Sequence, residues 1–187
     1  MKDWQGAWRD GHQSGTIASL LSAAVLAEGS RRETGSPYAC LNATSHWVWG
    51  DEAAAHEAPS LRHTAAGYLI HHAASCFWGI LYERVVGEQA DRLPGAAKVA
   101  AGLTAAGFAC LVDYRLVPQR LSPGFELRLS RRSIAAGYFA FGLGLALAGM
   151  DAASRGGEQR RRAAAASERR SQATCAATGR RRPSGRA

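Results

Sequence analysis

Four long stretches with almost no charged residues limit what this chain can fold into more than any other feature. They cover residues 11–27, 64–82, about 95–112 and 133–150, and Lys98 is the one formal charge within them. Each has roughly the length at which a helix crosses the hydrocarbon core of a bilayer. None has the charged face that a surface helix of this length would carry. The sequence therefore predicts an all-α fold with four transmembrane helices in a bundle. The expected spans are about 11–28, 64–84, 95–116 and 132–150.

Small residues recur every four positions in each stretch. Such stripes let helix backbones approach closely where no hydrophobic effect drives helices together, as in a membrane. A chain this rich in Ala also produces stripes by chance, so the argument rests on finding one in all four stretches. The third stretch has its stripe at positions 97, 101, 105 and 109. In the second and fourth stretches the predicted helix-packing residues are Gly67, Ser75, Gly79, Ala140 and Gly144.

The basic residues are divided unevenly between the two ends of such a bundle. Four spans place both termini on one side of the membrane. Without the tail, that side carries 5 Lys and Arg residues against 8 on the opposite side, which favours termini outside. Counted as far as Arg170, it carries 11 against 8. The positive-inside rule therefore predicts cytoplasmic termini in the inner membrane of a bacterium.

The net charge of +8 belongs to the C-terminal tail. Residues 1–150 hold 13 Lys and Arg against 12 acids, whereas residues 151–187 hold 10 Arg against 3 acids. This distribution does not indicate a basic domain built for nucleic acid. The tail has no Leu, Ile, Val or aromatic residue, so we expect a transmembrane domain at 1–150 and a disordered tail at 151–187. The tail is either a solvated extension or a segment attracted to anionic lipid headgroups.

The loop between the first two stretches is unusually apolar and aromatic. Residues 36–52 read "SPYACLNATSHWVWGDE", which is too short to span a bilayer. Aromatic residues with polar neighbours are typical of the membrane interface. We therefore predict a short interfacial or re-entrant helix in this loop.

Four ionisable residues are candidates for binding a ligand or metal: His46, His71, His72 and Asp113. Ionisable groups inside a membrane usually face the bundle interior or a cavity. The adjacent histidines point about 100° apart on a helix, so they cannot both bind one metal ion. A metal or haem site would need one of them together with His46, His63 or Asp113. The alternatives are a neutral imidazole bonded to a neighbouring helix, with His71 facing inward, and a proton relay.

No catalytic residue can be assigned. The chain has no nucleotide-binding loop, nucleophile elbow or paired-carboxylate site, and its four cysteines lack the spacing of a metal site. We therefore expect no bound cofactor, and a non-enzymatic protein is favoured.

The segments "LNATSHWVWGDEAA", "RHTAAGYLIHHAASCFWGILYE", "DYRLVPQRLSPGFE" and "YFAFGLGLALAG" resemble an uncharacterised family of small bacterial multi-pass membrane proteins. The resemblance covers roughly residues 14–150. It implies an inner-membrane location and a helical architecture, but no substrate and no functional residue.

The leading hypothesis is a structural or accessory component of a bacterial inner membrane. Its partners would be the lipid bilayer and either a second copy of the chain or another membrane protein. One alternative is a membrane-embedded metal-binding, haem-binding or proton-relay protein that uses the histidines. The other is a soluble, Ala-rich helical bundle.

Overall fold

The computed structural model describes residues 1–149 and 165–166, with the side chain of Asp91 left out. The chain divides into a unit of residues 1–150 and a unit of residues 151–187, and the fold described below is that of the first unit. Its described residues form helices, turns and loops, with no strand among them. The predicted all-α fold is confirmed. The predicted disordered tail falls outside the described residues, apart from positions 165–166.

The first helix, α1 (Trp4–Thr34), is longer than the predicted span of 11–28. At its start, the Asp3 carboxylate accepts a hydrogen bond from the Gly6 N–H at 2.8 Å and so caps a free backbone donor. At its end, Gly35 takes a left-handed conformation with φ of +83°. The helix continues past the apolar stretch on both sides because these two residues, rather than a change in apolarity, set its ends.

The second long helix is part of a continuous helical segment. Its centre, α4 (Ala66–Tyr82), is preceded by a π-helical turn at Leu61–Ala65 and followed by another at Glu83–Gly87. The segment ends with α5 (Glu88–Arg92). Leu93 is extended, with ψ of 151°, because Pro94 follows it and disfavours helical backbone in the preceding residue.

The third long helix begins directly after Pro94, a residue favoured at helix starts. It comprises α6 (Gly95–Leu111) and a π-helical turn at Val112–Leu116. Val117 is extended and precedes Pro118, so a second proline sets the end of this helix. The fourth long helix, Arg131–Gly149, is called helix 131–149 below.

Short helices fill the two long loops. The first loop contains α2 (Ala39–Thr44), α3 (His46–Trp49) and a 3₁₀ turn at Asp51–Ala55. The loop after α6 contains 3₁₀ turns at Gln119–Leu121 and Phe125–Leu127.

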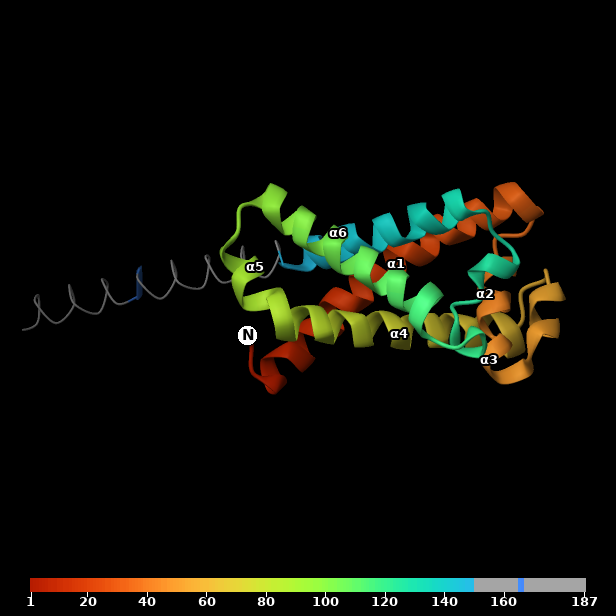
Figure 1. Ribbon diagram of the computed structural model, residues 1–187, viewed down its shortest axis with the longest axis horizontal. Helices are drawn as coiled ribbons and strands as arrows, with labels where there is room; N and C mark the ends of the chain where they lie inside the picture. The colour runs from red at the N-terminus through yellow and green to blue at the C-terminus, as the bar shows by residue number, and fades with distance from the viewer. Residues whose placement is uncertain (150–164, 167–187) are drawn as a thin grey trace, which may run out of the picture. The chain divides into compact units, whose positions relative to one another are not determined.

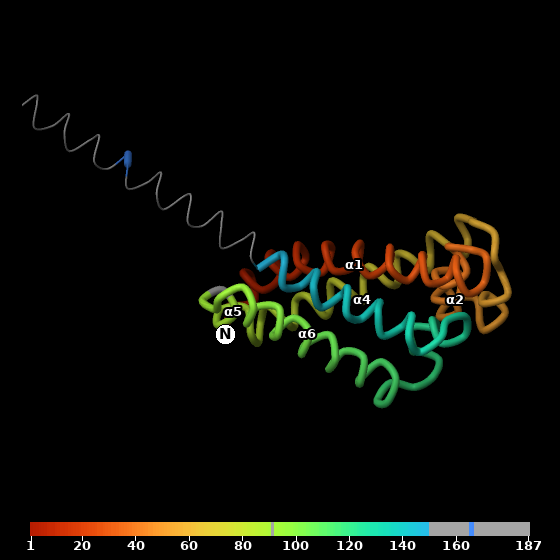
Figure 2. Tube along the Cα trace, turned by 90° about the horizontal axis from the view of Figure 1, so that it is seen from above, coloured from red at the N-terminus to blue at the C-terminus, as the bar shows by residue number. Residues whose placement is uncertain are grey.

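The four long helices lie side by side, and α6 runs obliquely to the others (Figures 1 and 2). The N-terminus and α5 lie at one end of the bundle, and α2 and α3 lie at the other (Figure 1). At the first end, the Lys2 ammonium pairs with the nearly buried Glu83 carboxylate at 2.6 Å. At the other end, the Glu33 carboxylate accepts hydrogen bonds from the N–H and hydroxyl of Ser130, so it caps helix 131–149 from α1.

Two of the described helices are long and apolar enough to cross a membrane. They are Gly95–Leu116 and Arg131–Gly149, with mean hydropathies of 1.6 and 1.2. Core helices of soluble proteins meet the same standard, so these two helices are weak evidence for a membrane location. The other two predicted spans correspond to α1 and α4, which do not meet that standard.

Candidate functional site

A cavity of about 470 Å³ lies among α4, the C-terminal end of α6, helix 131–149 and the loop after α6. Its volume lies within the range of small-molecule sites, and its wall is mostly apolar with a few polar groups, as in such sites. The ionisable groups that line it include His71 and Asp113. Six aromatic side chains also line it: Trp47, Phe77, Trp78, Phe125, Tyr138 and Phe141.

His71 lies on α4, lines the cavity and contacts α1 directly. Its Nε2 atom is 3.1 Å from the Ser22 hydroxyl and 3.3 Å from the Ser19 carbonyl oxygen. Because a carbonyl only accepts hydrogen bonds, the contact with Ser19 is made when Nε2 carries the ring proton. The ring also packs edge-to-face against Phe125, with centroids 5.8 Å apart. The imidazole N–H is therefore already bonded within the protein.

Asp113 lies in the π-helical turn that ends the third long helix, and it is half-buried. Its Oδ2 atom accepts a hydrogen bond from the Tyr138 hydroxyl on helix 131–149 at 2.6 Å. The Trp78 side chain also bonds to this carboxylate. An ionised carboxylate has about four acceptor positions, so these two bonds leave acceptor capacity free. No Lys or Arg is among the described residues that line the cavity. Asp113 is thus a carboxylate in an aromatic surrounding, without a cation beside it in the cavity wall.

The other two candidate histidines do not line the cavity. His72 places Nδ1 at 3.2 Å from the Ser19 hydroxyl and Nε2 at 3.7 Å from the Cys76 sulfur. The adjacent histidines therefore both contact Ser19, one through its carbonyl and the other through its hydroxyl. His46 is buried under the loop after α6, where its Nε2 lies 3.0 Å from the Ser122 carbonyl oxygen.

The structure brings His71 and Asp113 to one cavity and leaves His46 and His72 outside it. Among the described residues, no group of three His, Cys, Asp or Glu side chains is placed to hold a metal ion. Tyr138, Ser19 and Ser22 were not among the predicted site residues, although all three lie within the charge-free stretches.

The predicted packing residues lie at close helix contacts or in the buried interior. A Cβ atom on Gly79 would lie 2.5 Å from the Gly11 carbonyl oxygen of α1, and Gly144 lies against the backbone of α1 at Ala18. Gly67 contacts the backbone of α2 at Leu41. Ser75 and Ala140 are buried.

The close contact of α6 lies one position away from the expected stripe. Gly102 meets the backbone of helix 131–149 at Gly142, and Ala106 is buried, whereas Ala101 and Ala105 are only partly buried. The stripe at 97, 101, 105 and 109 was therefore wrong by one residue over most of its length, since the closest approach uses the glycine beside it.

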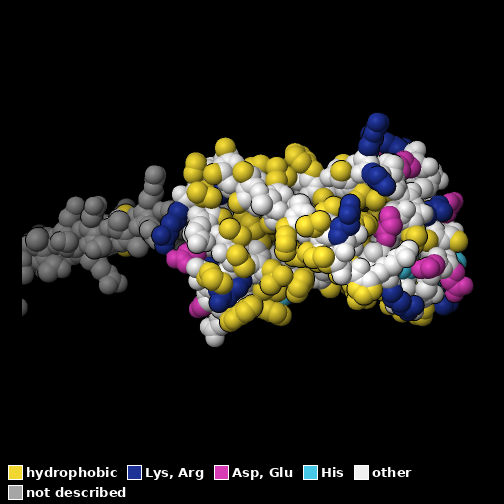
Figure 3. All heavy atoms as spheres, in the orientation of Figure 1, with side chains coloured by type: hydrophobic (Ala, Val, Ile, Leu, Met, Phe, Trp, Pro, Cys, Tyr) yellow, Lys and Arg dark blue, Asp and Glu magenta, His cyan; other side chains and the backbone are white. Residues whose placement is uncertain are grey.

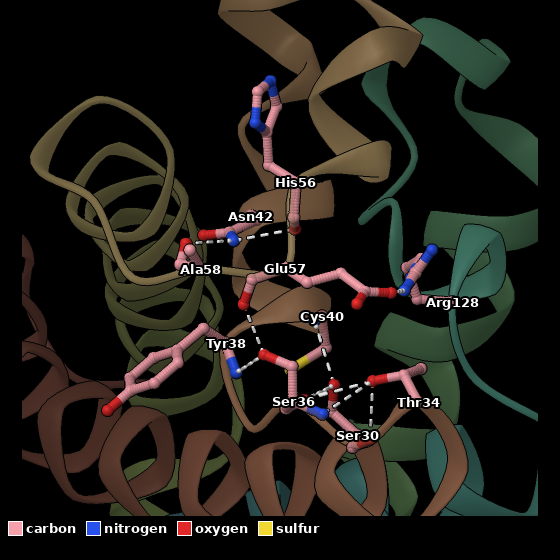
Figure 4. Close-up of polar contacts among 10 residues, drawn as sticks. All are labelled: Ser30, Thr34, Ser36, Tyr38, Cys40, Asn42, His56, Glu57, Ala58 and Arg128. Atoms are coloured by element: carbon pink, nitrogen blue, oxygen red, sulfur yellow. Dashed lines mark hydrogen bonds and ion pairs between the residues drawn. The ribbon is translucent and has the colours of Figure 1, made fainter.

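The helix in the first loop is buried in protein. All six residues of α2 are buried, including Asn42, which has no exposed surface. The Asn42 amide donates to the carbonyls of His56 and Ala58 at 2.9 and 3.1 Å (Figure 4), and its oxygen accepts from the Thr64 hydroxyl. The polar side chain of Asn42 is thus bonded inside the fold, and the interfacial or re-entrant position of this helix stays a prediction.

A second set of hydrogen bonds fastens this loop to α1. The Ser30 hydroxyl donates to the Ser36 carbonyl at 2.7 Å and accepts from the Cys40 N–H at 3.2 Å. The Ser36 hydroxyl donates to the Glu57 carbonyl, and the Glu57 carboxylate pairs with Arg128 from the loop after α6 (Figure 4). The two loops at this end of the bundle are therefore joined to each other and to α1.

Burial raises the pKa of the Cys40 thiol to about 11, so this cysteine stays protonated and acts as a small core side chain. The three described cysteines, Cys40, Cys76 and Cys110, are free.

Comparison of the chain with protein families, with curated proteins and with solved structures gave no match.

Proposed function

We propose that this chain is a multi-pass integral membrane protein in which all four long helices cross the bilayer. We further propose that it serves as a structural or accessory component of a bacterial inner membrane, with cytoplasmic termini. The resemblance of its motifs to small bacterial multi-pass proteins accords with this location.

One observation carries the proposal: polar side chains are buried and large apolar side chains are exposed on the same helix. On α1, Ser14, Ser19 and Ser22 are buried, whereas Leu20 and Leu21 are exposed. A helix of a water-soluble bundle turns its apolar stripe inward and its polar face outward. The opposite arrangement suits a helix whose outer surface meets lipid and whose small polar residues pack against neighbouring helices.

The same exposure occurs on the other three long helices. Phe77 on α4, Phe108 on α6 and Phe139 on helix 131–149 each expose more than half of their surface, at 56, 57 and 54%. Apolar side chains occupy much of the middle of the face in Figure 3, and charged side chains gather towards the ends. Single exposed apolar residues are normal in soluble proteins, but a surface of this kind indicates contact with a membrane or a partner.

The low hydropathy of α1 is compatible with a spanning role. Three hydroxyls of its apolar stretch, those of Ser14, Thr16 and Ser22, bond to carbonyls of their own helix. Ser22, for example, donates to the Ala18 carbonyl at 2.7 Å. A hydroxyl satisfied in this way leaves no donor to be hydrated, which is the requirement for polar groups inside a bilayer.

Two measurements test the proposal. The full chain should remain in the membrane pellet after extraction with alkaline carbonate and should need detergent to dissolve. A monodisperse protein in the soluble fraction would show that the chain is a soluble helical bundle instead.

The second measurement compares charges placed at two exposed positions. Phe108→Glu puts a carboxylate on the outer surface of α6, where a membrane would make it costly by about 2 to 3 kcal/mol. Leu127→Glu makes the same change in an exposed loop position and serves as the control. We expect the first variant alone to lose membrane integration or stability in detergent. A soluble bundle would tolerate both, so equal tolerance contradicts the proposal.

A further inference from the structure

The cavity beside His71 and Asp113 has a chemical character that selects among small molecules. We propose that it binds an organic cation with a large apolar surface, such as a quaternary ammonium or phosphonium ion with alkyl or aryl groups. The inference rests on the proposed membrane location, from which such an ion would partition into the protein.

The charge of the cavity argues for a cation. Asp113 is the acid among the described lining residues, and none of those residues is Lys or Arg. A phosphate or carboxylate ligand would find no basic partner there and would meet the Asp113 carboxylate. Burying an unpaired charge is costly in an apolar surrounding, so a ligand of opposite charge is favoured over one of like charge.

The hydrogen-bonding capacity of the wall leads to the same conclusion. The donors that His71 and Tyr138 direct towards their neighbours are already used. His71 Nε2 contacts the Ser19 carbonyl, and the Tyr138 hydroxyl donates to Asp113. The Asp113 carboxylate keeps acceptor capacity beyond the bonds from Tyr138 and Trp78. A cation can occupy this capacity and be paired with the charge, which a neutral ligand cannot do.

The aromatic lining supplies the apolar part of the site. Its six rings come from α3, α4, helix 131–149 and the loop after α6: Trp47, Phe77, Trp78, Phe125, Tyr138 and Phe141. Aromatic faces attract cations through their quadrupoles, and this attraction is largest for Trp and when water is excluded. A cation surrounded by alkyl or aryl groups would satisfy both the rings and the carboxylate within a cavity of about 470 Å³.

The proposal is tested with two ions of the same size and shape and of opposite charge, tetraphenylphosphonium and tetraphenylborate. Binding to the detergent-purified full chain is measured by equilibrium dialysis and by quenching of Trp fluorescence, since Trp47 and Trp78 line the cavity. We expect saturable binding of tetraphenylphosphonium at one site per chain and at least about tenfold weaker binding of tetraphenylborate. Equal binding of the two ions would overturn the proposal, because it would show a cavity that selects apolar surface alone.

A pair of variants locates the charge. Asp113→Asn removes the negative charge and keeps an oxygen that accepts the Tyr138 hydrogen bond, so we expect binding of tetraphenylphosphonium to weaken about tenfold. Glu52→Gln removes an exposed acid outside the cavity and should leave binding unchanged. Unchanged binding by Asp113→Asn would overturn the proposal. If that variant fails to fold, the comparison of the two ions on the unaltered chain still decides the matter.

Retention of the chain in the carbonate-washed membrane separates this proposal from the proposed function. A membrane-integrated chain that binds neither ion refutes the cation site and leaves the membrane location standing. A chain recovered in the soluble fraction refutes the membrane location itself.

Discussion

Replacing Gly79 by Ala tests whether α1 and α4 are held together by backbone contact. A Cβ atom at position 79 would lie 2.5 Å from the Gly11 carbonyl oxygen and 2.8 and 2.9 Å from the backbone N and Cα of Gly15. All three atoms belong to the backbone of α1, so no side-chain rotation can relieve the clash. Reaching ordinary contact at 3.4 Å requires the two helices to separate by about 0.9 Å at this point.

A separation of this size has a calculable consequence. A radial gap of about 0.5 to 1 Å already forfeits a quarter to a half of the dispersion energy of each atom pair. Where lipid surrounds the helices, this packing is a main source of their association. We therefore expect Gly79→Ala to lower the free energy of unfolding by about 2 kcal/mol, within the usual range for overpacked sites.

Gly107→Ala is the matched control for this change. Gly107 lies in α6, and a Cβ atom there would have no heavy atom within 4 Å. The two variants can be compared by titration with sodium dodecyl sulfate in mixed micelles, with helix content followed by circular dichroism. We expect Gly107→Ala to be as stable as the unaltered chain or slightly more stable, because Ala favours helix over Gly. Equal midpoints for Gly79→Ala and the unaltered chain would refute the reasoning from close backbone contact.

Three further changes test other parts of the fold. Hydrogen bonds from Ser133 and Ser130 hold the pKa of Glu33 below its usual value, so the stability it adds is present above about pH 4.5 and is lost as the pH falls through the folded-state pKa. Glu33→Gln should therefore lower stability by about 0.5 kcal/mol at pH 7 in the same titration, and this difference should shrink below about pH 4. Lys98→Met should destabilise the chain by about 1 kcal/mol, because the ammonium donates to a carbonyl in the last turn of helix 131–149. His71→Leu should lower the free energy of unfolding by about 1 to 3 kcal/mol, because it leaves polar groups of α1 without a hydrogen-bond partner. We expect a smaller loss for His72→Leu. Equal losses for the two variants would contradict the prediction that the inward-facing ring of His71 contributes more to stability.

The sequence predicted where the four long helices lie, because the signals involved are local. Charge-free runs locate the helices. Pro94 and Pro118 mark helix boundaries, because each forces extended backbone in the residue that precedes it. The ends of α1 were missed by several residues, since they depend on the Asp3 cap and on the left-handed Gly35. The interhelical face of α6 was misplaced because a stripe in an Ala-rich helix does not reveal which of two adjacent small residues the neighbouring helix approaches.

The candidate site was predicted only in part. His71 and Asp113 were both recognisable as ionisable groups inside or beside apolar stretches. Their meeting at one cavity depends on the loop after α6, which places Phe125 against His71. No periodic pattern in that loop indicates its path, and nothing in the spacing of Trp47 and Trp78 places both at one cavity. Non-local packing of this kind is not encoded in the spacing of residues.

The low mean hydropathy of α1 has a structural cause, which bears on the proposal that this helix crosses the bilayer. Its buried face carries Ser14, Ser19, Ser22 and Ser30, and its exposed face carries Leu20, Leu21 and Val25. An average over all residues counts the serines as if they met lipid, although neighbouring helices cover them. The hydroxyls of Ser14, Ser22 and Ser30 bond to carbonyls within their own helix or to nearby loop backbone, so they stay satisfied without water and still permit close packing. The serine hydroxyls and carbonyls of this face also bond the two histidines of α4, which would otherwise be costly in an apolar interior. The features that lower the hydropathy of α1 are therefore the same ones that let His71 and His72 lie within the bundle.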